Sequence, residues 1–172
     1  MSALSKSLLI VLITAVVVHL AVILSTPNLL MAVAFKRLSD DGRRVNVMVH
    51  SPQTSETSRT IVRLSPDLAY SSCAFDLSKG PVRVKAAKAS DYMSVSVYAA
   101  NSDNIFAVND RQAPNGVDLI IIGKGQAAPS GAALVVQSPT QRGIVLERRL
   151  APSAETFAVA DLARKQDVCT PL

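Results

Sequence analysis

The sequence has few of the side chains on which enzyme chemistry usually depends. Its 172 residues include two histidines, two cysteines and no tryptophan, and its aromatic residues are three tyrosines and four phenylalanines. His19 lies inside an apolar run, so a Ser-His-Asp triad would depend on His50 alone, and the chain has no G-x-S-x-G motif. The sequence therefore offers no catalytic residue, and we expect a protein that is not an enzyme.

Metal and nucleotide motifs are missing as well. His50, Cys73 and Cys169 stand far apart in the sequence, which excludes the usual spacing of metal ligands. Gly123–Gly125 is not a P-loop, since no Ser or Thr follows its lysine. Carboxylates occur singly along most of the chain, so a carboxylate-based hydrolase would require folding to bring two of them together. We expect no metal and no cofactor.

The charge does not indicate a nucleic-acid partner. The net charge is +5, from 18 Lys and Arg against 13 Asp and Glu, but the basic residues are scattered and few aromatics accompany them. Attraction to anionic lipid explains this excess more simply.

One long apolar run stands out. Leu8–Leu24 is 17 residues without a formal charge, and a span over about residues 7–26 would match the ~30 Å hydrocarbon core of a bilayer. A cleaved signal peptide is the alternative, with Ala32–Ala34 as the small-x-small site before Phe35. We favour a retained anchor because the run exceeds the usual 7–15 residues of a signal peptide.

Pro27 follows this run and predicts a break in the helix. Thr26 would cap a second, short helix that lies at the membrane interface and stops near Gly42, which completes an N-terminal unit of residues 1–42. The alternative is a continuous, tilted span through Phe35.

Residues 43–172 have the pattern of an all-β domain. Short β-rich runs alternate with turn residues and no long helix separates them, which favours an antiparallel β-sandwich or jelly-roll-like domain. The expected strands are 45–49, 59–64, 68–77, 82–86, 92–99, 105–109, 117–122, 133–137 and 144–149, with 120–122 central in its sheet.

One C-terminal helix is expected at about 153–167. Ser153 is a suitable N-cap, and the apolar residues Val159, Leu162 and Ala163 would face the sandwich. Cys169 follows this helix, and two states are open for its side chain. In an oxidising compartment it would form a disulfide with Cys73, which would stabilise the fold by about 4 kcal/mol; otherwise it is a free thiol on a frayed tail.

The run Arg63–Pro81, RLSPDLAYSSCAFDLSKGP, resembles the signature of the bacterial domain-of-unknown-function 1254 family. Similar segments follow at 92–98, 104–112 and 138–143, so the resemblance covers residues 58–150. It implies an all-β envelope protein with no established reaction. Larger members of that family join this domain to a second β domain.

Five residues are candidates for ligand binding: Arg63, Asp67, Tyr70, Asn109 and Arg111. Asp67 would lie at a rim of the sheet and accept hydrogen bonds from a ligand, with Tyr70 and Arg63 or Arg111 nearby, and the segment that begins at Asn109 would be a binding loop. The alternative is structural: Asp67 organises a turn after Pro66, the Tyr70 hydroxyl bonds to backbone, and the Asn109 segment is a polar loop.

The charges near the span and the rest of the sequence disagree on topology. One lysine precedes the span and four cations follow it, which favours a cytoplasmic C-terminal domain. Large domains translocate largely regardless of charge, and the resemblance favours the envelope. We therefore expect a single-pass protein of the bacterial inner membrane with a periplasmic domain.

The expected partners are the lipid bilayer and another envelope protein. The expected function is interaction or assembly without catalysis. The alternative is a module that binds a small molecule or glycan.

Overall fold

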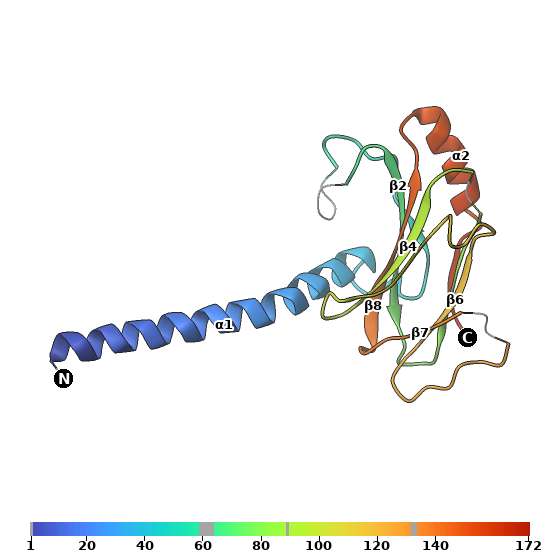
Figure 1. Ribbon diagram of the computed structural model, residues 1–172. Helices are drawn as coiled ribbons and strands as arrows, with labels where there is room; N and C mark the ends of the chain where they lie inside the picture. The colour runs from blue at the N-terminus through green and yellow to red at the C-terminus, as the bar shows by residue number, and fades with distance from the viewer. Residues whose placement is uncertain (1, 59–63, 89, 132–133) are drawn as a thin grey trace.

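A computed structural model describes residues 2–58, 64–88, 90–131 and 134–172. Two β-sheets pack face to face, and one long helix projects from them (Figure 1). The predicted strand at 59–64 falls almost entirely outside the described residues.

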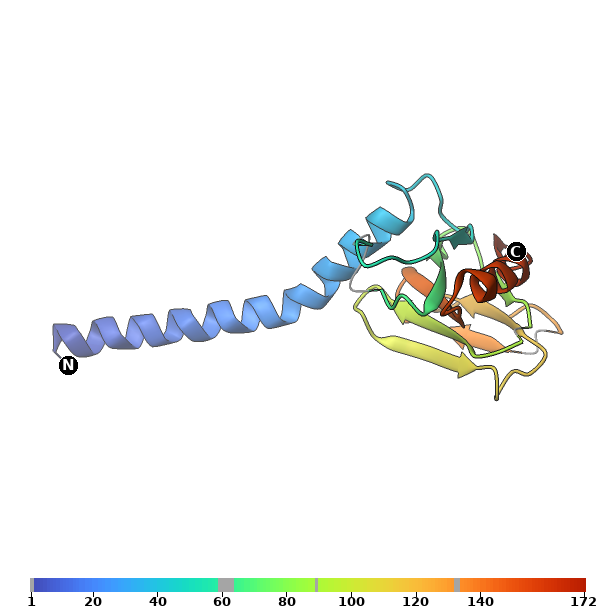
Figure 2. The ribbon, with the colours of Figure 1, turned by 90° about the horizontal axis from the view of Figure 1, so that it is seen from above.

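The long helix, α1 (Ala3–Leu38), begins at the N-cap Ser2 and contains Pro27. The structure thus differs from the predicted break at Pro27 and has the continuous helix instead. Proline removes the backbone donor for the Ile23 carbonyl, and the hydroxyls of Ser25 and Thr26 donate 2.6 Å hydrogen bonds to the carbonyls of Ala21 and Val22, a pattern that often bends a helix. The helix therefore bends rather than ends (Figure 2).

The first sheet has the strand order β1-β2-β8-β4-β5 and is antiparallel throughout. Its bounds are β1 Val49–His50, β2 Leu68–Asp76, β4 Met93–Ala99, β5 Asn104–Asn109 and β8 Arg142–Leu150. The predicted strand at 45–49 shrinks to β1, because Asn46 adopts a positive φ of 57°. The Asn46 side chain instead bonds to both backbone groups of Asp76.

The second sheet has the order β7-β6-β3-β9, with β3 Val82–Ala86, β6 Val117–Ile122, β7 Val135–Gln137 and β9 Val168–Pro171. β6 lies between two neighbours and is buried on both faces, as its run of three isoleucines predicts. Two features differ from expectation. β7 pairs with β6 in parallel, and the expected tail after the last helix forms β9, which pairs with β3.

Apolar residues from both sheets fill the space between them, including Phe75, Val84, Val97 and Ile121. A disulfide joins Cys73 in β2 to Cys169 in β9, with the Cα atoms 6.4 Å apart and a sequence separation of 96. It therefore ties the two sheets together.

The second helix, α2 (Ala154–Arg164), connects β8 to β9 and begins with a capping box formed by Ser153 and Thr156. The predicted packing face is wrong: Val159 and Leu162 are 56% and 67% exposed, while Ala160 and Arg164 are buried. The reason is the Arg164 guanidinium, which donates hydrogen bonds to backbone carbonyls of the sandwich and turns that face inward.

Candidate functional site

The predicted residues Asp67 and Tyr70 lie at the start of β2, in a local turn. The Tyr70 hydroxyl accepts a 2.9 Å hydrogen bond from the Ser65 amide, and the Ser65 hydroxyl accepts one of 3.4 Å from the Asp67 amide. The Asp67 carbonyl accepts a 2.7 Å bond from Ala151, while its carboxylate is exposed and has no hydrogen bond to the described residues. This arrangement fits the structural alternative for Tyr70, whose hydroxyl bonds to backbone, but not for Asp67, because the Ser65 hydroxyl and not the Asp67 carboxylate bonds within the turn. Arg63 lies outside the described residues.

Asn109 and Arg111 lie at the same end of the sheet but on its far side. The Asn109 side chain accepts bonds of 3.1 and 3.2 Å from the amides of Arg111 and Gln112, which closes the turn after β5. β8 and β4 separate β5 from β2, so three strand spacings, about 14 Å, lie between Asn109 and Tyr70. The structure thus brings Asp67 and Tyr70 together and leaves Asn109 and Arg111 apart from them.

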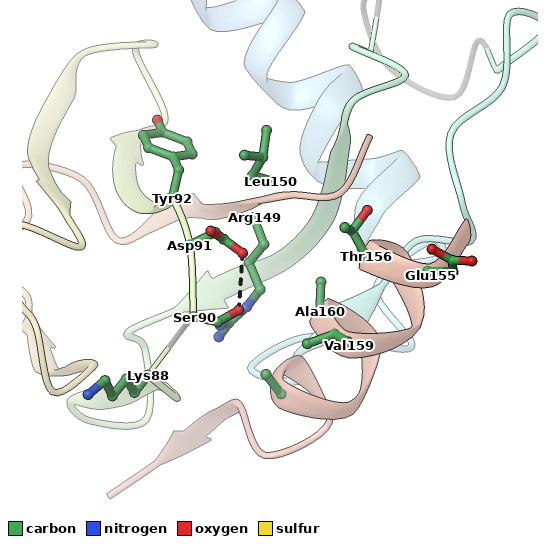
Figure 3. Close-up of a pocket in the computed structure, with 11 residues that line it drawn as sticks. Lys88, Ser90, Asp91, Tyr92, Arg149, Leu150, Glu155, Thr156, Val159 and Ala160 are labelled. Carbon is green, nitrogen blue, oxygen red and sulfur yellow. Dashed lines mark hydrogen bonds between the residues drawn. The ribbon is translucent and has the colours of Figure 1, made fainter. Parts of the chain in front are cut away.

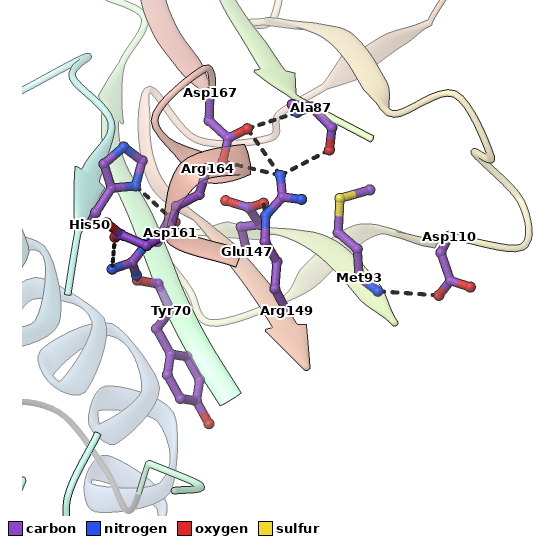
Figure 4. A network of polar contacts seen from close by, with 11 residues as sticks. His50, Tyr70, Ala87, Met93, Asp110, Glu147, Arg149, Asp161, Arg164 and Asp167 are labelled. Carbon is purple, nitrogen blue, oxygen red and sulfur yellow. Dashed lines mark hydrogen bonds and ion pairs between the residues drawn. The ribbon is translucent and has the colours of Figure 1, made fainter. Parts of the chain in front are cut away.

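A buried ionic cluster, which the sequence reading missed, lies between β8 and the start of β9 (Figure 4). Glu147 and Arg149 are 1% and 2% exposed, and an Oε1–Nε distance of 2.5 Å separates them. Arg149 Nη2 donates to Asp167 Oδ1 at 3.0 Å and to the Ala87 carbonyl at 2.9 Å. The Ala87 amide in turn donates to Asp167 Oδ1 at 2.7 Å. We call Glu147, Arg149 and Asp167 the ionic cluster.

The ionic cluster holds two carboxyl groups against one guanidinium. Burial is the main cause that raises the pKa of Glu147, and the neighbouring Asp167 carboxylate adds to it; together they bring the pKa to about 8. Arg149 and Ser71 oppose this shift without cancelling it. The raised pKa favours the neutral form of Glu147, and Arg149 lies between its carboxyl group and that of Asp167.

Three further ionisable groups, Arg164, Asp161 and His50, lie beside the ionic cluster, where α2 meets the first sheet. Arg164 donates hydrogen bonds of 2.9 and 2.8 Å to the carbonyls of Tyr70 and Ser51, and it pairs with Asp161 at 2.6 Å. Burial, followed by the charge of Arg164, lowers the pKa of His50, whose Nδ1 lies 3.0 Å from the Ser71 hydroxyl. These contacts fix α2 on the sandwich.

A groove of about 470 Å³ runs between α2 and the chain just before β4 (Figure 3). Arg149 and Leu150 line it from β8, Tyr92 from the opposite wall and Val159 from α2. The Nη1 atom of Arg149 is buried and has no hydrogen-bond partner among the described residues. The groove thus combines an apolar wall with two cationic side chains, Arg149 and Lys88, and two acidic ones, Asp91 and Glu155.

The two carboxyl groups of the ionic cluster are too buried to resemble the catalytic carboxyl pair of a hydrolase. Both carboxyl side chains are almost fully buried, at 1% and 0% exposure, and neither Glu147 nor Asp167 lines the groove. A substrate and a water molecule would need space between such groups. The described residues also contain no group of three metal-ligating side chains.

One sequence signal does point to the ionic cluster. In the run 144–150, IVLERRL, Glu147 and Arg149 alternate with Leu146 and Arg148, so both share the inward face of β8 with Val145. Charged residues at inward positions of a strand usually pair with each other. The partner Asp167 has no such signal, because it lies in a turn after α2.

The family comparison matches residues 45–171 to a family described as protein of unknown function, DUF1254. Among solved structures, the VPA0106 protein from Vibrio parahaemolyticus is similar, with a TM-score of 0.61 and 14% identity over 88% of this chain. The chain spans 38% of the length of that Vibrio protein. An uncharacterized protein from Burkholderia cenocepacia has a TM-score of 0.47 and 17% identity over 66% of this chain and 33% of its own. These likenesses concern the fold alone, and no curated protein matches the sequence.

Proposed function

The chain belongs to the DUF1254 family of proteins of unknown function, and we propose that it is a single-pass protein of the bacterial inner membrane. In this proposal α1 crosses the bilayer and holds the β-sandwich at the periplasmic surface, where it acts as a non-enzymatic module for interaction or assembly with another envelope protein. The observation that carries the proposal is an exposed apolar helix that docks onto the sandwich only through its C-terminal third (Figures 1 and 2).

The free part of α1 has the length of a bilayer span. Residues 3–26 are all exposed, and 24 helical residues extend about 36 Å, against about 30 Å of hydrocarbon. The helix is long and apolar enough to cross a membrane, a criterion that a signal sequence also meets. Large exposed side chains such as Leu12, Val16 and Leu20 would each be costly in water and favourable in lipid.

The docked part of α1 makes specific contacts with the first sheet. Pro27, Met31 and Phe35 recur every four residues and are all partly buried, so they form one face of the helix. The guanidinium of Arg142, at the start of β8, lies 5.5 Å from the centre of the Phe35 ring. Such a joint would hold the sandwich at a fixed height over the membrane.

The periplasmic orientation is supported by the disulfide between Cys73 and Cys169. Disulfides persist in the periplasm and are reduced in the cytoplasm of most bacteria. The four cations after the span argue for the opposite side, but long domains translocate largely regardless of charge.

A second candidate function is binding of a small molecule or glycan, supported by the groove beside α2. Its apolar wall and the cations Arg149 and Lys88 suit a small organic acid or an acidic sugar, and Asp91 and Glu155 would accept hydrogen bonds from hydroxyl groups of such a sugar. A thermal-shift screen of such compounds tests it with Ala163→Trp, which fills the groove. The candidate predicts a compound that stabilises the parent protein and not the variant; it fails if no compound stabilises either.

Labelling of single cysteines tests the proposed topology. Lys124→Cys lies on an exposed loop of the sandwich, and Ser2→Cys lies at the exposed start of the chain. In intact spheroplasts, a membrane-impermeant maleimide should label position 124 and leave position 2 unlabelled until the membrane is broken. The reverse pattern would place the sandwich in the cytoplasm and overturn the proposal.

A further inference from the structure

A second groove, of about 570 Å³, lies where α1 meets the sandwich. The docked third of α1 forms one wall of this groove, and the start of β8 with the neighbouring loops forms the other. We call it the helix groove; the residues that matter here are Met31, Ala32, Phe35, Lys36, Arg142 and Gly143. Its position, just beyond the free part of α1, sets it at the level of the lipid head groups if that part spans the bilayer.

The helix groove combines an apolar floor with two cationic side chains, Lys36 and Arg142, and one carboxylate, that of Asp41. Arg142 donates to Asp76 through Nε alone, at 2.7 Å, so its terminal nitrogens make no hydrogen bond to the described residues. Its side chain is 62% exposed. Lys36 Nζ is also largely exposed and has a loose ion pair, 3.4 Å, with Asp41. Both cations can therefore take up a further anion without losing a buried partner.

The floor of the helix groove continues down α1 toward the proposed span. From Ala32 the same helix face passes through Asn28, Leu24, Ala21 and Val17, at steps of three and four residues. Every one of these four residues is exposed. A long hydrocarbon chain can therefore lie along this face while its polar end occupies the groove.

We propose that the helix groove binds the phosphate head group of an anionic phospholipid, with an acyl chain along the exposed face of α1. The inference rests on the proposed membrane insertion of α1. A lipid is the occupant because, beyond Asn28, the groove opens onto the exposed apolar residues Leu24, Ala21 and Val17, which a free phosphate would leave uncovered. The two cations with free donors supply the complementary charge.

The test uses the full chain in nanodiscs that contain phosphatidylcholine and phosphatidylglycerol. The protein is released with its bound lipid, and the phosphatidylglycerol that remains with it is compared with that of the disc. Three variants are compared: Lys36→Gln with Arg142→Gln removes both cations; Ala32→Trp fills the groove at unchanged charge; and Arg111→Gln removes an exposed cation at the other end of the sheet.

The parent protein and the Arg111 variant should retain phosphatidylglycerol preferentially. Removal of the groove cations should reduce this enrichment about fivefold per cation, the usual effect of one Lys or Arg at an anionic surface. Ala32→Trp should reduce it as well, which a general charge effect would not. Equal retention in all four proteins, or no enrichment in the parent, overturns the lipid site.

Co-purification with the disc separates this inference from the proposed function. If all four proteins remain in the disc while enrichment is absent, only the lipid site fails. If the parent protein does not enter the disc, membrane insertion itself fails.

Discussion

The hydroxyl of Ser102 donates a 2.8 Å hydrogen bond to the carbonyl oxygen of Pro27, across 75 residues of chain. Ser102 lies at the tip of the β4–β5 connection and has a positive φ of 72°, which serine adopts rarely. Pro27 is the first partly buried residue of α1. The hairpin tip therefore touches the helix where its free part ends, at the boundary between proposed anchor and sandwich.

The disulfide gives the first prediction. Replacement of both Cys73 and Cys169 by alanine should lower the free energy of unfolding by 2–5 kcal/mol, because the bridge closes a loop of nearly 100 residues in the unfolded chain. Denaturant unfolding in detergent measures it, and the parent protein treated with reductant should unfold like the variant. A parent protein with the same gel mobility before and after reduction would contradict the bridge.

Protonation of Glu147 makes stability depend on pH. The folded state holds a proton up to a pKa of about 8, whereas the unfolded chain releases it near 4.5. The contribution of Glu147 to the free energy of unfolding should therefore be fully present below pH 4.5 and be lost as the pH rises through 8. Unfolding measured from pH 5 to 9 should show this decline in the parent and in Glu155→Gln, an exposed control, but not in Glu147→Gln. An unchanged slope in Glu147→Gln would refute the assignment.

Arg149 should be far more important for stability than an exposed arginine with an equally good partner. Arg149→Met leaves the buried Asp167 carboxylate unpaired and should cost 3–5 kcal/mol, within the usual range for a broken buried pair. Arg83→Met breaks the exposed pair with Asp118 and should cost less than about 1 kcal/mol. Thermal unfolding of the two variants compares them directly, and similar losses would argue against a structural role of the ionic cluster.

In the turn before β2, Tyr70 should contribute more to the free energy of unfolding than Asp67. Tyr70→Phe removes the acceptor of the Ser65 amide and should cost about 0.5–1.5 kcal/mol. Asp67→Ala should stay within about 0.5 kcal/mol of the parent, because the Asp67 carboxylate is exposed and has no hydrogen bond to the described residues. A larger loss in Asp67→Ala than in Tyr70→Phe would show that Asp67 organises the turn after all.

Alternation of side chains predicted the regular strands well and the irregular ones badly. β3 and β6 have the expected bounds, because each alternates or fills a buried position between clear turns. The strand expected at 45–49 was lost to the side chain of Asn46, whose bonds to Asp76 no local pattern reveals. β9 was missed because its four residues form a strand only through pairing with β3.

The candidate site was harder to predict than the fold. Tyr70 and Asp67 were found together because they are neighbours in sequence, but the distance from Asp67 to Arg111 depends on the strand order. The ionic cluster depends on contacts between β8 and the turn after α2, residues 149 and 167. The inward face of α2 was assigned wrongly because Arg164 binds backbone carbonyls, which an apolar periodicity cannot anticipate.

The most direct test of the membrane proposal is the fate of α1 in cells. The full chain with a C-terminal tag is expressed, the membranes are washed with alkaline carbonate, and the intact mass of the protein is measured in pellet and supernatant. Retention of α1 as an anchor predicts a carbonate-resistant protein of about 18.2 kDa plus the tag. A soluble protein that begins at Phe35, or elsewhere after Leu24, would contradict it.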